Sequence, residues 1–396
     1  MKRSLSLTLL LALAACSADG SPLAAPAGSP AAARTADAAA YIVVLRDGTD
    51  PHAVARAAGV APRRTYMAAL RGFAATLNAE QVAALRHNPQ VAYVEPDAPV
   101  SLFTTQLFPV WGLDRIDQHA LPLNSRFIYS SSGTGVTIYV LDTGVRKTHA
   151  QFGGRADYIA NGAGGDFVGD GHGNAEDCHG HGTHVSAIAA GSGYGVAKNA
   201  TLRAGRVVDC TGQGTASMVL SGMEWIISYG RKPGVVNMSL GYGDVASVRD
   251  MATRLYYAGF VVTAAAGNGD FAGTPQDACK QSPAGARDIL TVGSTRSDDH
   301  ESSWSNYGLC VDLLAPGSSI RSAWVGSDTA SYVDSGTSMA SPHVAGVAAQ
   351  YLSLNPTANP QVVSMTIKSI ATSNAITFNG TSLYGGTPNK LLYTSY

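Results

Sequence analysis

Three polar side chains stand in sequence contexts that suit covalent catalysis. Asp142 follows the apolar run 139–141, His181 lies between two glycines, and Ser338 precedes a helical stretch of small residues. A serine hydroxyl becomes a strong nucleophile when a neutral histidine accepts its proton and a buried carboxylate orients that histidine. Together the three residues predict acyl transfer with Ser338 as nucleophile, His181 as base and Asp142 as its partner.

Each of these motifs has a simpler interpretation when it is taken alone. An acid after a strand commonly caps a helix or forms a turn, and a serine at the start of a helix is commonly a cap. Near His181, the short spacing of Cys178 and His179 would also suit a metal site. His184 is interpreted as a structural histidine. Catalysis is favoured because one chain carries all three motifs.

The elements that must position these residues follow one another as strands and helices. Strands are predicted at 136–141, 201–207, 235–239, 260–265 and 289–293. Helices are predicted at 181–190, 217–229, 245–258 and 338–354. Continuous Val/Ile runs separated by helices are typical of a parallel sheet covered on both faces, with functional groups at the carboxyl ends of the strands. The pattern predicts an α/β domain with three layers.

The segment before this domain has its own pattern. Strands are predicted at 41–45, at 66–77 as one or two strands, and at 91–94, with helices at 51–58 and 78–87. This β-α-β-β-α-β order is the ferredoxin-like plan, here as a small α+β domain. A domain of about 60 residues is only marginally stable alone, so we expect it to be stabilised by binding a partner.

The N-terminus has the pattern of an export signal. Lys2 and Arg3 precede the apolar run 5–15, and small residues follow, so a signal peptide is predicted over 1–20 with an Ala/Pro/Gly/Ser linker at 21–40. The run is too short to remain as a membrane span. Leu13-Ala-Ala-Cys16 is similar to a lipoprotein box, which leaves open a membrane anchor through a lipid on Cys16. The alternative is ordinary cleavage after Ala14.

Charge and cysteine content narrow the function further. Charged residues make up 14% of the 396 residues and the net charge is -1, so no electrostatic footprint points to nucleic acid or to an anionic membrane. Four cysteines lie outside the export segment: Cys178, Cys210, Cys279 and Cys310. An even set in an exported protein indicates two disulfides, and the residues alone allow three pairings.

The motifs also resemble a known family. Three motifs carry the resemblance, in the order Asp, His, Ser: Tyr139-Val-Leu-Asp142-Thr-Gly, Gly180-His181-Gly-Thr-His and Ser335-Gly-Thr-Ser338-Met-Ala-Ser-Pro. With them, the chain over 41–396 resembles the subtilisin family and, within it, the proteinase K and aqualysin branch. The resemblance implies a secreted serine endopeptidase. It implies broad specificity, with a preference for an apolar or aromatic residue before the scissile bond.

The resemblance also implies roles for further residues. Asn268, in Ala264-Ala-Ala-Gly-Asn268, is expected to donate to the oxyanion together with the Ser338 backbone N–H. An extended substrate is expected to pair with two edge segments, whose implied substrate-binding residues are Gly212 and Gly214 on one side and Ser239, Leu240 and Gly241 on the other. Tyr242 departs from the glycine usual in this branch and leaves the shape of the primary pocket open.

The small domain resembles the inhibitory prodomain of this family. It is implied to be an intramolecular chaperone and inhibitor at 41–103, followed by the catalytic domain at 104–396. Autocleavage is expected between Phe103 and Thr104, within about two residues, because the mature chain in this family begins shortly before a motif like that at Trp111. The expected partners are protein or peptide substrates and the prodomain, and the catalytic domain is expected to be a monomer.

Disulfide pairing and calcium are likewise implied by the resemblance. The aqualysin branch pairs its cysteines in sequence order, which gives Cys178–Cys210 and Cys279–Cys310. One calcium site is expected from main-chain oxygens of Arg287 and Ile289 with Asp312. A second is expected from Asp114, Asp117 and Gln118, since calcium binds oxygen ligands. The alternative at both places is a set of surface acids in turns.

The sequence disfavours two other function classes. A non-catalytic binding protein on this fold would be favoured by a broken catalytic motif, and none of the three is broken. A lipase or esterase would be favoured by a G-x-S-x-G turn at the nucleophile. That turn is absent at Ser338, and the order Asp, His, Ser differs from that of those enzymes.

Overall fold

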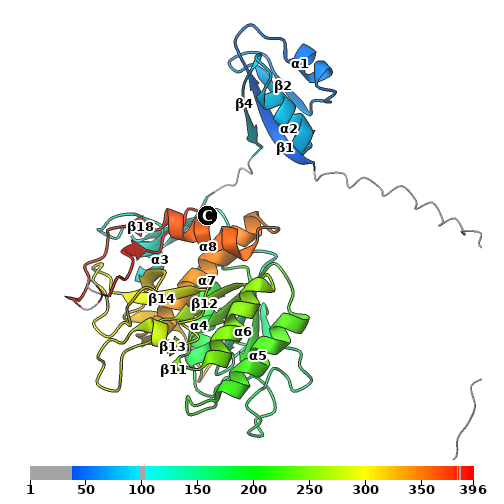
Figure 1. Ribbon diagram of the computed structural model, residues 1–396. Coiled ribbons are helices and arrows are strands. Elements are labelled where there is room, and N and C mark those ends of the chain that lie inside the picture. The colour runs from blue at the N-terminus through cyan, green and yellow to red at the C-terminus, as the bar shows by residue number, and fades with distance from the viewer. Residues whose placement is uncertain (1–37, 98–102, 381, 383–384) are drawn as a thin grey trace, which may run out of the picture. The chain divides into compact units, whose positions relative to one another are not determined.

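The computed structural model describes residues 38–97, 103–380, 382 and 385–396. The chain divides into two compact units, one ending at Pro99 and the other beginning at Val100. Figure 1 draws both, and each is described here by itself. The predicted signal peptide, most of the linker and Cys16 lie outside the described residues.

The first unit is a four-stranded antiparallel sheet with two helices. Its elements are β1 (Ala39–Leu45), α1 (Pro51–Ala57), β2 (Arg64–Tyr66), β3 (Gly72–Leu77), α2 (Ala79–Arg86) and β4 (Val91–Pro96), with strand order β2-β3-β1-β4. Asn78 begins α2 with a capping box, in which its side chain and that of Gln81 accept each other's backbone N–H. The predicted β-α-β-β-α-β order is confirmed.

The second unit is built on a nine-stranded sheet of order β18-β19-β15-β14-β12-β10-β7-β9-β8. The strands are β7 (Thr137–Asp142), β8 (Ala156–Tyr158), β9 (Thr201–Arg206), β10 (Gly234–Met238), β12 (Val261–Ala265), β14 (Leu290–Thr295), β15 (Leu313–Pro316), β18 (Thr372–Ser373) and β19 (Lys390–Leu391). All neighbours are parallel except β18 and β19. The predicted parallel sheet is confirmed.

Helices cover both faces of this sheet, as Figure 1 shows for α4 (His181–Ala190) and α7 (Thr337–Leu354) on one side and α5 (Ala216–Tyr229) and α6 (Ala246–Tyr257) on the other. Successive side chains of β7 alternate between the two layers, because side chains of a strand point to opposite faces. Ile138 and Val140 pack with α4 and α7, while Tyr139 and Leu141 pack with α5 and α6. The three-layer α/β prediction is therefore correct.

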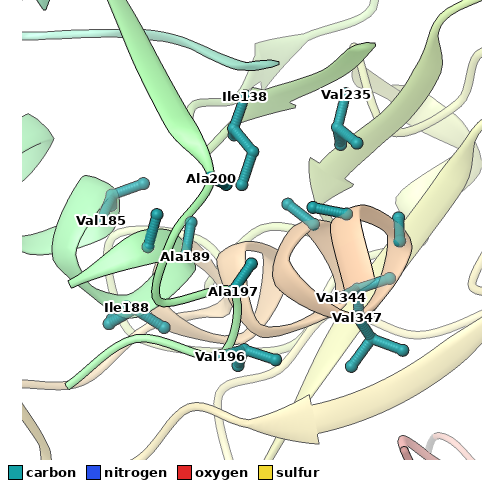
Figure 2. Packing of buried hydrophobic residues seen from close by; sticks show 14 of the residues in the cluster. Ile138, Val185, Ile188, Ala189, Val196, Ala197, Ala200, Val235, Val344 and Val347 are labelled. Carbon is teal, nitrogen blue, oxygen red and sulfur yellow. The ribbon is translucent and has the colours of Figure 1, made fainter. Parts of the chain in front are cut away.

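The core beneath α4 and α7 is made of small and branched side chains. Figure 2 shows Ile138 and Val235 reaching from the sheet toward Ala189 of α4 and Val344 of α7. Small residues let these two helices approach closely, and Gly346 leaves no room for a side chain because an added Cβ would lie 2.5 Å from Val196. This packing fixes the two helices that carry His181 and Ser338.

Several elements were not predicted from the sequence. They include the hairpin β16 (Ile320–Ala323) and β17 (Ser331–Asp334), α3 (Trp111–Ile116), α8 (Pro360–Ile370), the pair β5 (Thr104–Leu107) and β6 (Arg126–Tyr129), and the short pair β11 (Tyr242–Gly243) and β13 (Gln281–Ser282). Among the described residues, every helix is too short or too polar to cross a membrane.

Candidate active site

Asp142 and His181 meet at the carboxyl edge of the sheet. Asp142 is the last residue of β7 and is almost fully buried, while His181 is the first residue of α4. The Nδ1 atom of His181 lies 2.7 Å from Oδ1 of Asp142. This contact places the ring proton on Nδ1 and leaves Nε2 as the acceptor, which is the tautomer that a general base needs.

The charge around His181 favours its protonated form. Burial opposes protonation, but Asp142 outweighs it through its charge and hydrogen bond, so the pKa of His181 is raised above the ordinary imidazole value. Asp334 and Asp177 add to this effect with their negative charges. The protonated form of His181 is therefore stabilised by the carboxylates around it.

Asp177 is a positioning residue that the sequence analysis missed. Its carboxylate is buried and accepts hydrogen bonds from the hydroxyls of Thr143 and Thr183 and from the backbone N–H groups of residues 179, 180 and 183. It thereby joins the residue after Asp142 to the first turn of α4. An acid four residues before His181 had no motif of its own, because isolated acids in turns are common.

Ser338 is the second residue of α7, and Figure 1 places that helix against the sheet. Its hydroxyl donates to the carbonyl oxygen of Ser239 at 3.0 Å, and among the described residues no hydrogen bond joins it to His181. Contacts of this kind are often loose in a free enzyme and tighten when substrate binds. The Ser239 hydroxyl donates back to the Ser338 carbonyl at 2.7 Å.

A buried polar network supports this end of α7. Asn237 donates to the Ser239 hydroxyl and accepts from Thr263 and Ser341 through its side-chain oxygen, at 2.8 to 3.0 Å. All four residues are buried. Because a buried network that is fully paired is rigid, it fixes the positions of β10, β12 and α7 relative to one another beside Ser338.

The side chain of Asn268 is held through its oxygen, and among the described residues no acceptor pairs with its N–H₂ group. Its side-chain oxygen accepts both the backbone N–H and the hydroxyl of Thr337, each at 2.8 Å. The amide nitrogen lies on the same side as Gly336, where an added Cβ would be 3.3 Å away from it. Asn268 therefore offers a donor beside the start of α7, and Thr337 is a second positioning residue that the sequence analysis missed.

A cavity of about 380 Å³ adjoins His181. Four of the five expected substrate-binding residues line it, namely Gly212, Ser239, Leu240 and Gly241, together with Asp142, Thr143, His179, Val208 and Thr211. Gly214 is exposed but does not line it. The two expected edge segments therefore contribute residues to one cavity beside His181.

Tyr242 lies beside this region in β11. Its hydroxyl is buried and has no partner among the described residues, and burial raises the pKa of Tyr242 to about 12. β11 pairs with β13 through Tyr242 and Ser282. The side chains of Tyr242 and Leu240 both pack against the core formed with α5 and α6.

The structure contains the disulfides Cys178–Cys210 and Cys279–Cys310, which is the pairing implied by the resemblance. Among the described residues, the one cluster that could hold a metal through histidine and cysteine is His172 with Cys178 and Cys210. Those two sulfurs are bonded to each other, so they are not thiolate ligands. His184 donates from Nε2 to the carbonyl oxygens of Ile320 and Tyr332, in keeping with the structural role predicted for it.

Two of the three expected ligands of the first calcium site, Asp312 and Arg287, already have hydrogen-bond partners. Lys368 Nζ lies 2.9 Å from one oxygen of Asp312, and the Thr291 N–H donates to the other. The Thr253 hydroxyl donates to the main-chain oxygen of Arg287 at 3.3 Å. A cation at this place would compete with Lys368, so these residues fit calcium poorly in this arrangement.

The second expected site fits a cation better. Oδ1 of Asp117 and Oε1 of Gln118 are both buried and have no donor among the described residues. Burial, with the nearby charge of Asp114, raises the pKa of Asp117 to about 6 against an opposing backbone hydrogen bond. Asp114 itself accepts the backbone N–H groups of Asn124 and Ser125. Two buried oxygens without donors beside a second carboxylate suit a hard cation.

Comparison with known families and proteins gives a consistent result. A model described as the subtilase family matches residues 133–386, and one described as peptidase inhibitor I9 matches residues 40–103. The chain is 45% identical over 333 residues to an extracellular serine proteinase of Thermus sp. (strain Rt41A), covering 84% of this chain and 78% of the relative. It is 44% identical to alkaline serine exoprotease A of Vibrio alginolyticus, covering 82% of this chain and 59% of that protein.

Among solved structures, the chain is similar to the crystal structure of a cold adapted subtilisin-like serine proteinase. The two are 45% identical, the TM-score is 0.67, and the match covers 73% of this chain and 99% of that chain.

Proposed function

The chain belongs to the subtilase family of serine proteinases, and we propose that it is an exported endopeptidase that cuts proteins through an acyl-enzyme on Ser338. The observation that carries this proposal is the 2.7 Å contact between His181 Nδ1 and Asp142 Oδ1, at the same sheet edge as Ser338, which is half-buried at the start of α7. That contact fixes the tautomer whose Nε2 can accept the serine proton.

The proposed reaction runs in two stages. Ser338 Oγ attacks the scissile carbonyl carbon while His181 Nε2 takes the hydroxyl proton, and the oxyanion accepts hydrogen bonds from Asn268 Nδ2 and the Ser338 N–H. When the C–N bond breaks, the leaving amine takes the proton from His181. Water then attacks the acyl ester, gives a proton to His181, and releases the acid as Ser338 recovers its hydroxyl.

The cavity beside His181 is proposed to bind an extended peptide with little dependence on its sequence. Backbone pairing with the segments of Gly212–Gly214 and Ser239–Gly241 is tolerant of sequence, because it uses main-chain groups common to all residues. We infer a preference for an apolar or aromatic residue before the scissile bond. Tyr242 and Leu240 supply apolar surface near the cavity.

The first unit is proposed to be an inhibitory prodomain that the enzyme removes. The I9 match at 40–103 and the division of the chain near residue 99 support a boundary at Phe103–Thr104. Phe103 is a large apolar residue, 69% exposed, which suits a site of attack. N-terminal sequencing of the mature enzyme tests this: a start within two residues of Thr104 is expected, and a start upstream of residue 98 or downstream of Trp111 would overturn it.

Calcium is proposed as a structural ion held by Asp114, Asp117 and Gln118. The ion would neutralise and bridge buried oxygens, and it would take no part in the proposed reaction.

Export is proposed through the segment 1–20, in line with the extracellular naming of the Thermus relative. A lipid on Cys16 would stay with the prodomain after cleavage, and the mature domain is proposed to act as a monomer.

The test of the proposed function is the Ser338→Ala variant. It is expected to leave the precursor unprocessed and to lose proteolysis of casein, while its circular dichroism and cooperative thermal unfolding are those of a folded protein. Processing and casein cleavage at the wild-type rate in Ser338→Ala would overturn the proposal.

A further inference from the structure

A second cavity lies at the edge of the nine-stranded sheet where the parallel strands begin. It has a volume of about 590 Å³ and is lined by Thr137 and Thr201, the first residues of β7 and β9, whereas Asp142 is the last residue of β7. At about 3.3 Å per residue, the length of β7 separates Thr137 from Asp142 by about 17 Å. The proposed reaction gives the residues of this cavity no role.

Two further cavities continue this one along the same edge. One, of about 570 Å³, shares Asp157 and Arg203 with it, and the other, of about 390 Å³, shares Ala160, Trp225 and Tyr229. Because neighbouring cavities have lining residues in common, they form one continuous groove, which we call the amino-edge groove. A groove of this length suits a polymer chain better than a single small molecule.

Positive charge predominates in the amino-edge groove. Arg203 is half-buried, Arg231 and Lys232 are exposed, and among the described residues no salt bridge engages any of the three. Asp157, the carboxylate among the lining residues, lies opposite Arg203 in the β8–β9 pair and 3.1 Å from a fourth cation, Lys147. Guanidinium groups present planar sets of donors that match carboxylates. The groove therefore suits an acidic ligand.

Aromatic side chains form another part of the groove. Trp225 and Tyr229 lie one turn apart on α5 with their ring centroids 5.6 Å apart, and Tyr229 is 70% exposed. Tyr139 is buried, and its hydroxyl oxygen accepts the backbone N–H of Arg231 at 2.6 Å. Among the described residues, the O–H of Tyr139 has no acceptor. The groove thus offers apolar surface and a neutral donor beside its cations.

The edge of the sheet favours a polypeptide as the occupant. β8 is the last strand in the sheet order, and among the described residues β9 is its one neighbour in the sheet. All three residues of β8 line the groove. An extended peptide can add to such an edge through its backbone N–H and C=O groups, which an acidic polysaccharide does not have.

We propose that the amino-edge groove is an exosite, a second binding site that holds an acidic, aromatic-containing segment of a protein substrate while another segment is cut at Ser338. Its cations bind the carboxylates, and the aromatic pair of α5 packs against the aromatic side chains. A peptide of about four residues spans only about 13 Å, so it cannot reach both sites. This inference rests on the proposed function and names a class of long substrates for it.

The test uses mature enzyme and polypeptide substrates in which a donor and a quencher flank one apolar cleavage site. A Gly/Ser linker of about 20 residues, with a root-mean-square span of roughly 25 Å, joins this site to a tail of alternating Glu and Tyr, or of alternating Gln and Tyr. We expect the Glu tail to lower KM about tenfold with kcat unchanged, as an effective concentration of about 1 mM and a tail Kd of about 0.1 mM would give. This difference should vanish in about 1 M salt.

Charge reversal at exposed residues separates the exosite from the active site. Arg231→Glu with Lys232→Glu should raise the KM of the Glu-tail substrate at least to that of the Gln-tail substrate, and Tyr229→Ala should raise the KM of both. Arg126→Glu with Arg254→Glu, the same charge change at exposed residues outside the groove, should leave the KM ratio as in wild type. All these variants should cut a tetrapeptide at the wild-type rate.

Three results would overturn the exosite: equal KM for the two tails in wild type, a Glu-tail preference that survives charge reversal at Arg231 and Lys232, or its loss in the control variant. Stronger competition by polygalacturonate than by the free Glu/Tyr tail, at equal carboxylate concentration, would also overturn it, since the groove would then bind acidic polysaccharide. Wild-type enzyme that does not cut the tetrapeptide would overturn the proposed function itself. Cleavage of the tetrapeptide together with equal KM for the two tails would overturn the exosite alone.

Discussion

Asp177 and Thr183 form a buried pair in which the carboxylate accepts both the backbone N–H, at 2.8 Å, and the hydroxyl, at 2.6 Å, of the threonine. Thr183 in turn uses its hydroxyl oxygen to accept the Arg146 N–H. This pair fixes the first turn of α4, whose first residue is His181. The geometry of His181, the proposed base, thus depends on residues that have no part in the proposed reaction.

The pH dependence of catalysis should follow His181. Its pKa is raised, so kcat/KM should fall on acidification with a midpoint above the ordinary imidazole value of about 6.5. Asp334→Asn removes a nearby negative charge and should move this midpoint downward. Glu224→Gln, on the exposed side of α5, is the control and should leave it in place. A midpoint that rises in Asp334→Asn would contradict the assignment.

Loss of the Asn268 donor should affect turnover more than binding. Asn268→Ala is expected to lower kcat by about 10²- to 10³-fold, the magnitude known for the equivalent donor in subtilisin, with little change in KM. Thr337→Val removes the hydroxyl bond that orients the amide and should cause a smaller loss. Steady-state kinetics on one peptide substrate distinguish these effects. A change confined to KM would show that Asn268 binds the ground state instead.

The two disulfides should contribute to stability alike but to activity differently. They close loops of 32 and 31 residues, each worth roughly 3 to 4 kcal/mol in the chain-entropy model. Urea unfolding of inactive Ser338→Ala protein should show similar losses when Cys178 and Cys210, or Cys279 and Cys310, are both replaced by Ala. In active protein, the variant without Cys178–Cys210 should lose more kcat/KM, because this disulfide holds the segment that leads into His181. Equal kcat/KM in the two double variants would contradict this role of the disulfide.

Calcium should stabilise the folded protein through Asp117 and Gln118. In Ser338→Ala protein, which cannot digest itself, addition of calcium after chelation should raise the melting temperature, since an ion bound only by the folded state stabilises it by about 2.7 kcal/mol at one hundred times its Kd. Asp117→Asn should abolish most of this rise, and Asp312→Asn should not. The reverse pattern would place the ion at the site of Lys368.

The family and the α/β fold could be predicted because their signals are local. The predicted helix 181–190 agrees with α4 residue for residue, and the predicted strands of the sheet differ from the observed ones by one or two residues. The family assignment is confirmed by the matches at 133–386 and 40–103. Helix α8 was missed although Asn359 caps it and Pro360 follows, a start signal that could have been recognised.

The supporting residues could not be predicted because their roles depend on contacts between distant segments. Asp177 bonds Thr143, 34 residues away, and Thr337 bonds Asn268, 69 residues away. The engagement of Asp312 by Lys368 joins residues 56 apart and weakens one of the two expected calcium sites. Each residue alone has the appearance of an ordinary turn or surface residue.

Covalent labelling of Ser338 is the sharpest test of its role as the nucleophile. Mature enzyme is treated with a sulfonyl fluoride, digested with a second protease, and mapped by mass spectrometry, with mature enzyme incubated without the reagent as the control. We expect one adduct, on Ser338, whose formation matches the loss of activity, and no adduct and no matching loss in the control. Inactivation with the adduct on another residue, or full activity retained by enzyme labelled completely at Ser338, would contradict it.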